Sequence, residues 1–406
     1  MQYSRDTESK FRAYPQKGES LMQISLRQYL AAICSVLILS GCASTSGSDA
    51  QPTVDLSDLP TAKPSRTLAS YSMRPEQQQC YDRTSEPYTA VVDTHFHPRP
   101  FGGQAIEPDE LFNYFDRLGV RFVNYFGIGQ VLELDSGCTY YLDCVGVSAL
   151  PSIKNDFVNG MEMAAYPHDN LNVVLSMTFM DLANPDDIVE TIRLYDKEYP
   201  GMFKWAGELN VMKQALLGNN AEPSTRESID GWAPFMAVLR ERGIPVTLHS
   251  DLGNDDNPTE HLYLMDHVLA SYPDNKIVWA HMGLSKELTT MDPAQHVALM
   301  SERLDRYPNL MLDISWDVLY NSYHEWGSVF IPFFNKYYNR ILPGSDFVAA
   351  SNKDFGKYAH ELEVTSRALR VLDDRAFRHI ALGENYFRFL GLDYNAPEVC
   401  QATAQR

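Results

Sequence analysis

Residues 244–281 read IPVTLHSDLGNDDNPTEHLYLMDHVLASYPDNKIVWAH. The stretch begins with a short apolar, β-branched run, 244–249, and ends with a second one, 276–281. Between them, residues 261–272 carry apolar side chains at helical spacing, which predicts an amphipathic helix. Two adjacent strands joined through a helix run parallel, because a parallel pair needs a long crossover connection. The stretch therefore predicts one strand–helix–strand unit of a parallel sheet.

The same alternation continues along the chain in both directions. Helical spacing recurs in residues 229–242 and 293–307. Eight strand candidates without a glycine-rich nucleotide loop favour a closed (β/α)8 TIM barrel, an α/β fold, over an open sheet. The predicted strands are Tyr88–Thr94, Val120–Phe126, Asn172–Thr178, Met202–Glu208, Ile244–His249, Lys276–His281, Leu310–Ser315 and Ile341–Asp346.

We expect one barrel domain over residues 81–400. Its longest irregular stretch, 127–170, follows the second predicted strand. Loops at the carboxyl ends of barrel strands build the active site, so this insertion is expected to shape the substrate site. A purely structural cap is the alternative.

Residues 1–41 are predicted to be a signal-peptide region, with Met22 as a possible start. An apolar run at 29–39 follows the single charge of Arg27 and ends in small residues. Such a run is too short for a permanent membrane span and is typical of a signal peptide. Residues 42–80 begin with a stretch rich in Ser, Thr, Pro and Ala, which predicts a flexible tether.

The end of this region, Leu39-Ser40-Gly41-Cys42, resembles the lipobox of bacterial lipoproteins. The resemblance implies cleavage before Cys42 and lipidation of that cysteine. Ala43 then favours the outer membrane, so we expect a lipid-anchored protein of the bacterial cell envelope that faces the periplasm. An ordinary secretory signal and a buried helix are the alternatives.

Four cysteines remain for the folded domain, and four cysteines permit three pairings. A local Cys138–Cys144 bond would close a short loop. A Cys80–Cys400 bond would tie the two ends of the domain together. An oxidising periplasm makes these disulfides the expectation, with buried free thiols as the alternative.

Composition and charge narrow the class of protein. Apolar residues make up 44% and charged residues 21% of the 406 residues, an ordinary balance for a globular chain. Lys and Arg number 34 against 53 Asp and Glu, which gives a net charge of −19. This excess of acid argues against electrostatic nucleic-acid binding and says little about other partners. The expectation of a small-molecule substrate comes from the strand-end residues described below, not from the charge.

Histidines and one aspartate fall at the ends of the predicted strands. His95 and His97 share a strand face, because side chains alternate along a strand. His249, His281 and Asp346 close three later strands. The carboxyl ends of barrel strands converge, so these five side chains are expected to meet.

This ordered set resembles the amidohydrolase superfamily, and most closely its amidohydrolase-related (amidohydrolase 2) branch. The resemblance covers residues 88–393 and implies a TIM barrel of the metal-dependent hydrolase type. The matching segments are His95–His97, His249, His281, Leu312–Ser315, Gly344–Asp346 and Gly383–Leu390.

The resemblance also implies a metal centre. His95, His97, His249 and Asp346 would surround a divalent cation, with Zn²⁺ favoured by imidazole and carboxylate ligands. Asp346 would act as ligand, general base or both. His281 would polarise the substrate carbonyl or assist proton transfer, or it would ligate a second metal.

The fourth predicted strand departs from part of the superfamily. Some relatives place a carboxylated lysine there to bridge two metals. Lys204 and Glu208 are predicted to share a strand face, with Glu208 nearer the mouth of the barrel. Glu208 is the favoured bridging or second-metal ligand and carboxylated Lys204 the alternative, which leaves one or two ions open.

Weaker expectations concern residues beside these motifs. Asp93 is expected to form a hydrogen bond behind the metal site rather than a metal bond. Arg99 and Trp316 are candidate substrate-binding residues, Arg99 for an anionic group. Other residues expected near the site are Lys213, Trp205, Asp313 and Asp317.

The leading hypothesis is therefore a lipid-anchored, metal-dependent hydrolase that directs an activated water at an amide, lactone or ester-like bond. A metal-dependent, non-oxidative decarboxylase of an aromatic or unsaturated acid is the first alternative. The second is a noncatalytic, metal-containing binding protein of the envelope. The oligomeric state stays open.

Overall fold

The computed structural model describes residues 66–86, 91–319 and 326–401. They belong to one unit, which spans residues 54–406. Cys42, the expected signal region and most of the tether lie outside the described residues. Within the described ranges, no helix has the length and apolar composition that a membrane crossing requires.

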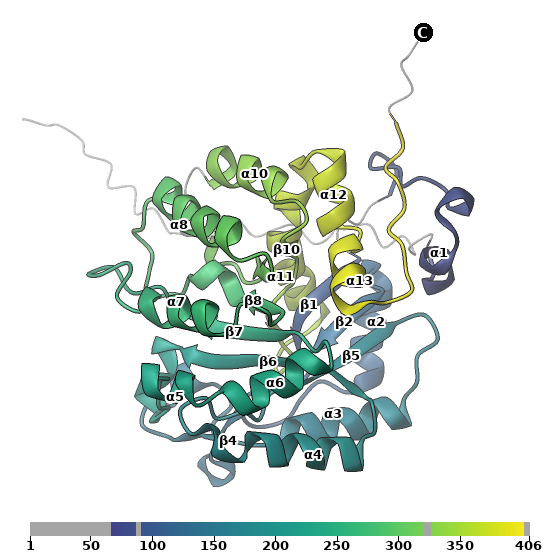
Figure 1. The fold of residues 1–406 in the computed structure, drawn as a ribbon. Coiled ribbons are helices and arrows are strands. Elements are labelled where there is room, and N and C mark those ends of the chain that lie inside the picture. Colours follow the sequence, from purple (N-terminus) through teal and green to yellow (C-terminus); the bar gives the residue numbers. More distant parts are fainter. Residues whose placement is uncertain (1–65, 87–90, 320–325, 402–406) are drawn as a thin grey trace, which may run out of the picture. The chain divides into compact units, whose positions relative to one another are not determined.

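Parallel strands form the centre of the fold (Figure 1). Among the described residues the main sheet has the order β10-β9-β8-β7-β6-β5-β2-β1-β11, and each neighbouring pair is parallel. The strands are β1 (Val92–His97), β2 (Phe122–Tyr125), β5 (Asn172–Met177), β6 (Phe203–Met212), β7 (Val246–Ser250), β8 (Ile277–Trp279), β9 (Leu310–Asp313), β10 (Ile341–Leu342) and β11 (Phe347–Val348).

The sheet closes on itself through residues 341–348. β10 pairs with β9, and β11 pairs with β1. Between these two short strands, the Thr94 N–H donates to the Pro343 carbonyl (3.0 Å), and the Asp346 N–H donates to the His95 carbonyl (2.8 Å). β10 and β11 are thus two parts of the eighth barrel strand, and the fold is the predicted (β/α)8 barrel.

Helices surround the strands (Figure 1). The strands are buried on both faces, as expected for parallel strands covered by helices; all side chains of β7, for example, are buried. The helices are α1 (Leu68–Ser72), α2 (Pro108–Leu118), α3 (Lys154–Ala165), α4 (Ile188–Glu198), α5 (Arg226–Asp230), α6 (Ala233–Glu241), α7 (Leu262–Ser271), α8 (Pro293–Arg306), α10 (Trp326–Lys336), α11 (Phe355–Arg367), α12 (Asp374–Ile380) and α13 (Glu384–Leu390).

The helix predicted over 229–242 is divided into α5 and α6. Pro234 lies in the first turn of α6. A proline inside a continuous helix would clash with the carbonyl four residues earlier, whereas the first turn tolerates it. The predicted helices at 261–272 and 293–307 correspond closely to α7 and α8.

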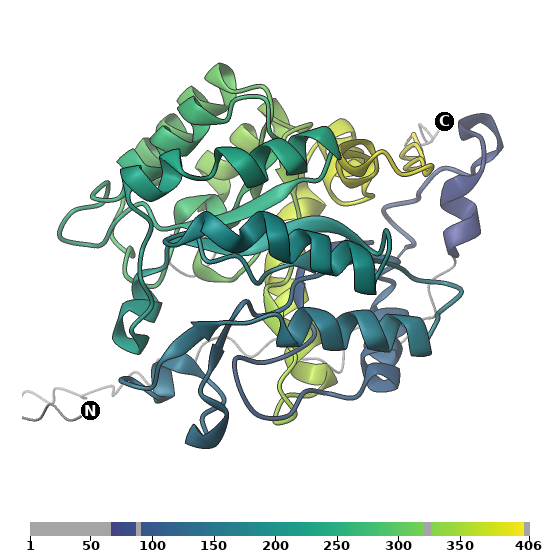
Figure 2. The same cartoon turned by 60° about the horizontal axis from the view of Figure 1, so that its bottom comes forward.

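The expected insertion at 127–170 contains regular structure. Its first part holds an antiparallel pair, β3 (Gln130–Leu132) and β4 (Ala149–Pro151). Its second part is α3, the crossover helix before β5, so the segment added to the barrel is 127–153. β4 lies at the bottom of the view in Figure 1, and Figure 2 brings that side of the molecule forward.

The described part of the chain contains two disulfides, Cys80–Cys400 and Cys138–Cys144. The first joins segments 320 residues apart in the sequence, whereas the second spans only 6. Next to the long-range bond, the Tyr81 N–H donates to the Glu398 carbonyl (2.7 Å). The N-terminal segment is thereby attached to the end of the barrel domain.

Loss of the long-range disulfide should destabilise the domain more than loss of the short one. Chain-entropy arguments give up to about 5 kcal/mol for the Cys80→Ala/Cys400→Ala variant and about 2 kcal/mol for Cys138→Ala/Cys144→Ala. Urea unfolding followed by circular dichroism measures both. A larger loss from the short-loop variant would contradict this account.

Candidate metal centre

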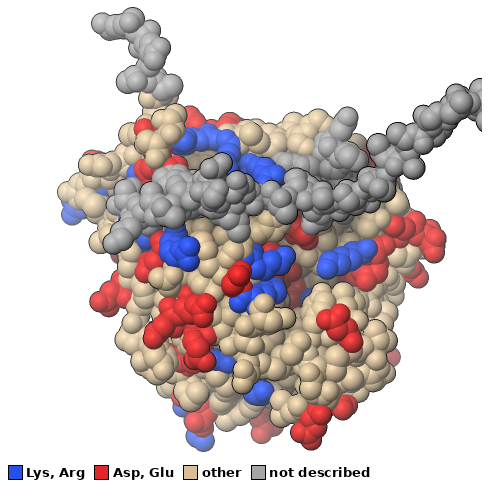
Figure 3. Space-filling model, turned by 180° about the vertical axis from the view of Figure 1, so that it is seen from behind, with Lys and Arg blue, Asp and Glu red and all other residues tan. Residues whose placement is uncertain are grey.

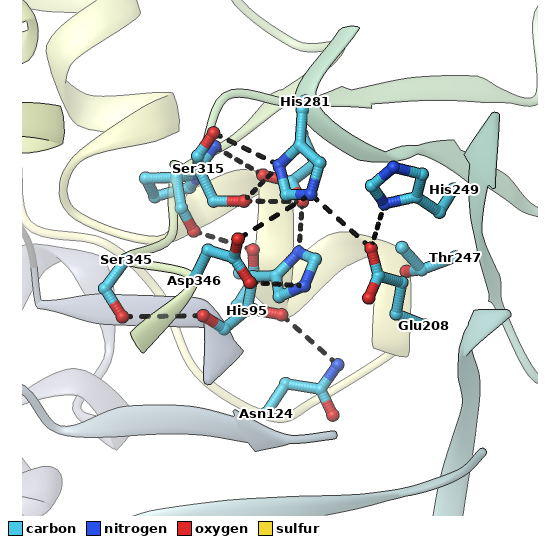
Figure 4. A network of polar contacts seen from close by, with 12 residues as sticks. His95, Asn124, Glu208, Thr247, His249, His281, Ser315, Ser345 and Asp346 are labelled. Atoms are coloured by element: carbon cyan, nitrogen blue, oxygen red, sulfur yellow. Dashed lines mark hydrogen bonds and ion pairs between the residues drawn. The ribbon is translucent and has the colours of Figure 1, made fainter. Parts of the chain in front are cut away.

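Imidazole and carboxylate side chains meet at the carboxyl ends of the barrel strands (Figure 4). The imidazoles and Glu208 are buried, and the Asp346 side chain is 17% exposed. The donors are His95 and His97 on β1, Glu208 on β6, His249 on β7, His281 in the turn η7 (Ala280–Gly283) directly after β8, and Asp346 between β10 and β11.

His95, His97 and Asp346 form the first group of donors. The Nε2 atoms of His95 and His97 lie 3.2 Å apart. Oδ1 of Asp346 lies 3.3 Å from the first and 3.2 Å from the second of these atoms. Ligands at the corners of a tetrahedral zinc site, each about 2.0–2.1 Å from the ion, are separated by about 3.3 Å. The three atoms therefore have the spacing of one face of such a site.

Glu208, His249 and His281 form the second group. Oε1 of Glu208 contacts Nδ1 of His249 and lies 3.4 Å from Nε2 of His281. The other oxygen, Oε2, lies 3.9 Å from Nε2 of His97. The two oxygens of Glu208 thus face the two groups, and Figure 4 shows His281 between Asp346 and Glu208.

Buried carboxylates fix two of the imidazoles from outside the cluster. Nδ1 of His95 lies 2.5 Å from Oδ2 of Asp313. Nε2 of His249 lies 2.9 Å from Oδ1 of Asp251. Each carboxylate accepts the outward N–H, which leaves the lone pair of the other ring nitrogen directed into the cluster.

Carbonyl groups fix the other two imidazoles. Nδ1 of His97 lies 3.3 Å from the Gly127 carbonyl. Nδ1 of His281 lies 3.3 Å from the carbonyl and 3.1 Å from Oγ of Ser315. All four rings therefore have one nitrogen held by an outer acceptor and the other facing the centre, the arrangement that metal-ligating histidines adopt.

The two inner carboxylates are held in the ionised form. Burial alone would raise the pKa of Asp346, but His95 and His97 keep it well below its usual range. Burial would likewise raise the pKa of Glu208, but Lys213 and His249 keep it well below the usual value. Ionised carboxylates beside oriented imidazoles are a donor set that fits Zn²⁺.

Zinc affinity should rise with pH up to about pH 9. Burial alone would lower the pKa of His95, but Asp313 and Asp346 raise it to about 9. Below that pH a cation has to displace the imidazole proton, so affinity should fall by about tenfold per pH unit for each proton released. Chelator competition between pH 6.5 and 9 measures this slope.

Asp313→Asn supplies the control, because it removes the carboxylate that raises the pKa of His95 most. The slope should become shallower in this variant. A zinc affinity that does not change with pH in the unmodified protein would contradict the interpretation.

The predicted ligand set is divided between the two groups. His249 was expected beside His95, His97 and Asp346 around one ion. The structure instead places it with Glu208 and His281. Strand order explains the correction, because β7 is separated from β1 by β6, β5 and β2 on one side of the barrel.

Lys204 does not share the buried face of Glu208. Lys204 is exposed, whereas Glu208 is buried. The pairing of β6 with β7 shifts register between Ala206 and Leu209, so simple alternation fails there. Gly207 has φ +116, and a Cβ at this position would lie 2.4 Å from the Thr247 carbonyl oxygen. Carboxylated Lys204 is therefore excluded from the centre.

Arg99 is also placed away from the expected role. Its Nε donates to Oδ1 of Asn159 (3.1 Å), and its guanidinium forms an ion pair with Glu162. Both partners belong to α3. Arg99 does not line the cavity that lies above His97 and Asp346, which is described below. The charge of Arg99 therefore attaches α3 to the loop after β1.

Asp93 holds the closing strand segment. It accepts hydrogen bonds from the backbone N–H (2.9 Å) and Oγ (2.7 Å) of Ser345, the residue before Asp346. The Tyr358 hydroxyl donates a third hydrogen bond (3.1 Å). Burial raises the pKa of Asp93 to about 6. This is the expected position behind the site.

A cavity of about 350 Å³ opens above the first group of donors and includes His97 and Asp346 in its lining. Trp316 and Asp317 line it, whereas Trp205 is buried in the barrel core. Four lysines from three segments of the chain also line the cavity: one follows β6, one follows β8, and two lie between β11 and the first turn of α11. Only Lys213 was expected near the site, because lysines on separate segments give no sequence pattern. The four lysines are Lys213, Lys286, Lys353 and Lys357.

Asp251 and Ser315 are outer partners that sequence analysis did not assign. The signal was present for Asp251, which follows His249 by two residues at a strand end, so the side chains are able to lie on one side. Ser315 holds His281 across two different strand ends, and no local spacing indicates such a contact.

The fold and the site together define a (β/α)8 barrel with a candidate metal centre at the carboxyl ends of its strands. Residues 203–392 match the model of the amidohydrolase family. The matched part is just under half of the chain and contains Glu208, His249, His281 and Asp346. No curated protein matches the chain.

Several solved structures resemble this one at low sequence identity. Dihydroorotase from Campylobacter jejuni is 14% identical, with 75% of this chain and 83% of that chain covered and a TM-score of 0.48. A zinc-bound amidohydrolase from Burkholderia multivorans is 14% identical, with 75% and 99% covered and a TM-score of 0.47. Beta-aspartyl dipeptidase from Fervidobacterium islandicum is 12% identical, with 78% and 76% covered and a TM-score of 0.46.

Proposed function

We propose that this protein is a metal-dependent hydrolase of the amidohydrolase kind, acting on an amide, lactone or ester-like bond. The observation that carries the proposal is the orientation of the imidazoles: each has one nitrogen in the cluster and the other on an outer acceptor. The family match over residues 203–392 supports the same class.

The donor groups indicate which residues would hold metal. His95, His97 and Asp346 would hold one ion, most favourably Zn²⁺. Glu208, His249 and His281 would hold a second. A divalent ion in such a site polarises a carbonyl group and lowers the pKa of bound water to about 7. Glu208 lies between the two groups and is proposed to bridge them.

Asp346 and His281 are the proposed proton-transfer residues. Oδ1 of Asp346 faces His95 and His97, while Oδ2 lies 3.9 Å from Nε2 of His281. The Asp346 carboxylate is held ionised, so it has a lone pair that can accept a proton from an attacking water. Without a second ion, Nε2 of a protonated His281 lies where it can donate a hydrogen bond to the substrate carbonyl or a proton to the leaving group. With a second ion, the same Nε2 atom would instead be a ligand.

Metal content and a hydrolysis panel test this proposal. The purified protein should contain a divalent metal by elemental analysis and should hydrolyse at least one class among amides, lactones and esters. A folded, metal-replete protein that hydrolyses none of them would overturn the proposal. Release of CO₂ from an aromatic acid by such a protein would indicate the decarboxylase instead.

We also propose that the protein is anchored through a lipid on Cys42, at the outer membrane and facing the periplasm. The lipobox-like sequence supports this location, and the two disulfides agree with an oxidising compartment. Cells grown with labelled palmitate should label the full-length protein and not the Cys42→Ala variant. Unlabelled, fully soluble full-length protein would contradict the proposal.

A further inference from the structure

One wall of the cavity is aromatic. Phe101, Tyr140 and Tyr141 all line it. The ring centroids of Phe101 and Tyr141 lie 4.6 Å apart, as do those of Tyr140 and Tyr141. The Cys138–Cys144 bond closes the loop that carries both tyrosines. The planes of these two ring pairs are inclined by 70° and 47°. The covalent closure restricts the loop and keeps the inclined aromatic rings at one side of the cavity.

Lys286 provides a positive charge at the same cavity. Its Nζ lies 5.5 Å from the centre of the Trp316 ring. Burial raises the pKa of Tyr140, and the charge of Lys286 opposes that rise, which indicates that the ammonium group lies near the aromatic wall. No carboxylate among the described residues lies within ion-pair distance of Lys286.

The other cavity lysines already have carboxylate partners. Nζ of Lys213 lies 3.2 Å from Oε2 of Glu208. Lys353 and Lys357 share Glu361, at 3.7 Å and 3.1 Å. Lys286 is therefore the cavity cation, within the part of the chain described, whose charge is available to a ligand.

The charge of the outer surface gives no reason to expect an anionic ligand. Lys and Arg are interspersed with Asp and Glu on the face shown in Figure 3. The net charge of −19 would disfavour an anionic ligand at long range. Lys286, an exposed cation that lines the cavity, is the local feature that would reverse this preference.

We propose that Lys286 determines specificity by binding a carboxylate of the substrate, while the flat, ring-shaped or unsaturated body of that substrate lies against the wall formed by Phe101, Tyr140 and Tyr141. This inference rests on the proposed function for the position of the reacting bond. Lys286 does not reach the donor cluster in this account; it positions the far end of the substrate.

Benzoate and benzamide are the probes, because they share a ring and differ in charge. Calorimetry on the metal-replete protein should show tighter binding of benzoate. Lys286→Gln should weaken benzoate binding by about 5-fold, the upper range for an exposed ion pair, and leave benzamide binding unchanged. Tyr140→Ala should weaken both probes, because it removes part of the aromatic surface.

Lys197→Gln is the matched control, since it makes the same charge change at a side chain that is 78% exposed on α4. Three outcomes overturn the inference: equal affinity of the unmodified protein for both probes, unchanged benzoate binding in Lys286→Gln, or an equal loss in Lys197→Gln. A carboxylate that binds only to the metal produces the second outcome. The metal-replete protein could hydrolyse none of the amides, lactones and esters and still bind benzoate more tightly than benzamide. That result would overturn the proposed function and leave this inference standing.

Discussion

Asp346→Asn is expected to lower the hydrolytic rate by about a thousand-fold, the scale of a lost general base at a metal site. The asparagine keeps the shape of the side chain but cannot accept the proton of an attacking water. It also places a neutral group where Nε2 of His95 and Nε2 of His97 now face a carboxylate oxygen.

The backbone conformation at position 346 accommodates asparagine, so the substitution should change the chemistry of the side chain and not the stability of the fold. Asp346 has φ +58, in the left-handed region. Asparagine tolerates this conformation about as well as aspartate, whereas most other residues would be strained. The variant should therefore unfold at nearly the same denaturant concentration as the unmodified protein.

Steady-state turnover, metal content and urea unfolding should be measured on the same preparation. Asp230→Asn is the control, because this carboxylate is 67% exposed and pairs with His267 away from the cavity. The expected loss of turnover is about a thousand-fold. If a folded Asp346→Asn protein keeps turnover within about threefold of the unmodified enzyme, the role assigned to Asp346 is refuted.

Glu208→Gln is expected to reduce the bound metal from two ions to about one per protein. The substitution removes the carboxylate of the second donor group and leaves His249 and His281 as neutral ligands. The first group keeps its three donors, because the closest approach of Glu208 to it is 3.9 Å, at His97. Elemental analysis, with anomalous scattering at the zinc edge of a crystal, would count and locate the ions.

The control for this prediction is Glu198→Gln, an exposed carboxylate on α4 that pairs with Lys197. Two ions in Glu208→Gln would show that Glu208 does not bridge. A single ion in the unmodified protein and in both variants would show that the second donor group does not hold metal. Glu208→Gln also breaks the ion pair between Glu208 and Lys213. Lys213→Met breaks the same ion pair but keeps the Glu208 carboxylate, so it separates the loss of the ion pair from the loss of a metal ligand.

Local sequence was sufficient for the parts of the site that belong to one strand. The pair at His95 and His97 shares a face because side chains alternate in β1. The same rule failed in β6, where a register shift separates Lys204 from Glu208. Alternation holds only while the ladder is regular, and a single sequence does not show where pairing with β7 slips.

Long-range partners were beyond the reach of sequence. Asp313 ends β9 and Ser315 follows it, yet they fix His95 and His281, which belong to other strand ends. No sequence pattern marks Lys286, because its proposed role depends on its position near Tyr140. Tyr140 lies in a loop more than a hundred residues earlier in the chain.

By itself, the sequence determined the eight-fold strand and helix alternation, the (β/α)8 barrel and the side chains at the strand ends. These follow from hydrophobic periodicity and strand geometry, which act over a few residues. Only the tertiary structure decided that the donors divide into two groups around Glu208, that Arg99 belongs to α3, and that lysines line the cavity. Those features depend on which strands become neighbours when the sheet closes, and that is a property of the whole chain.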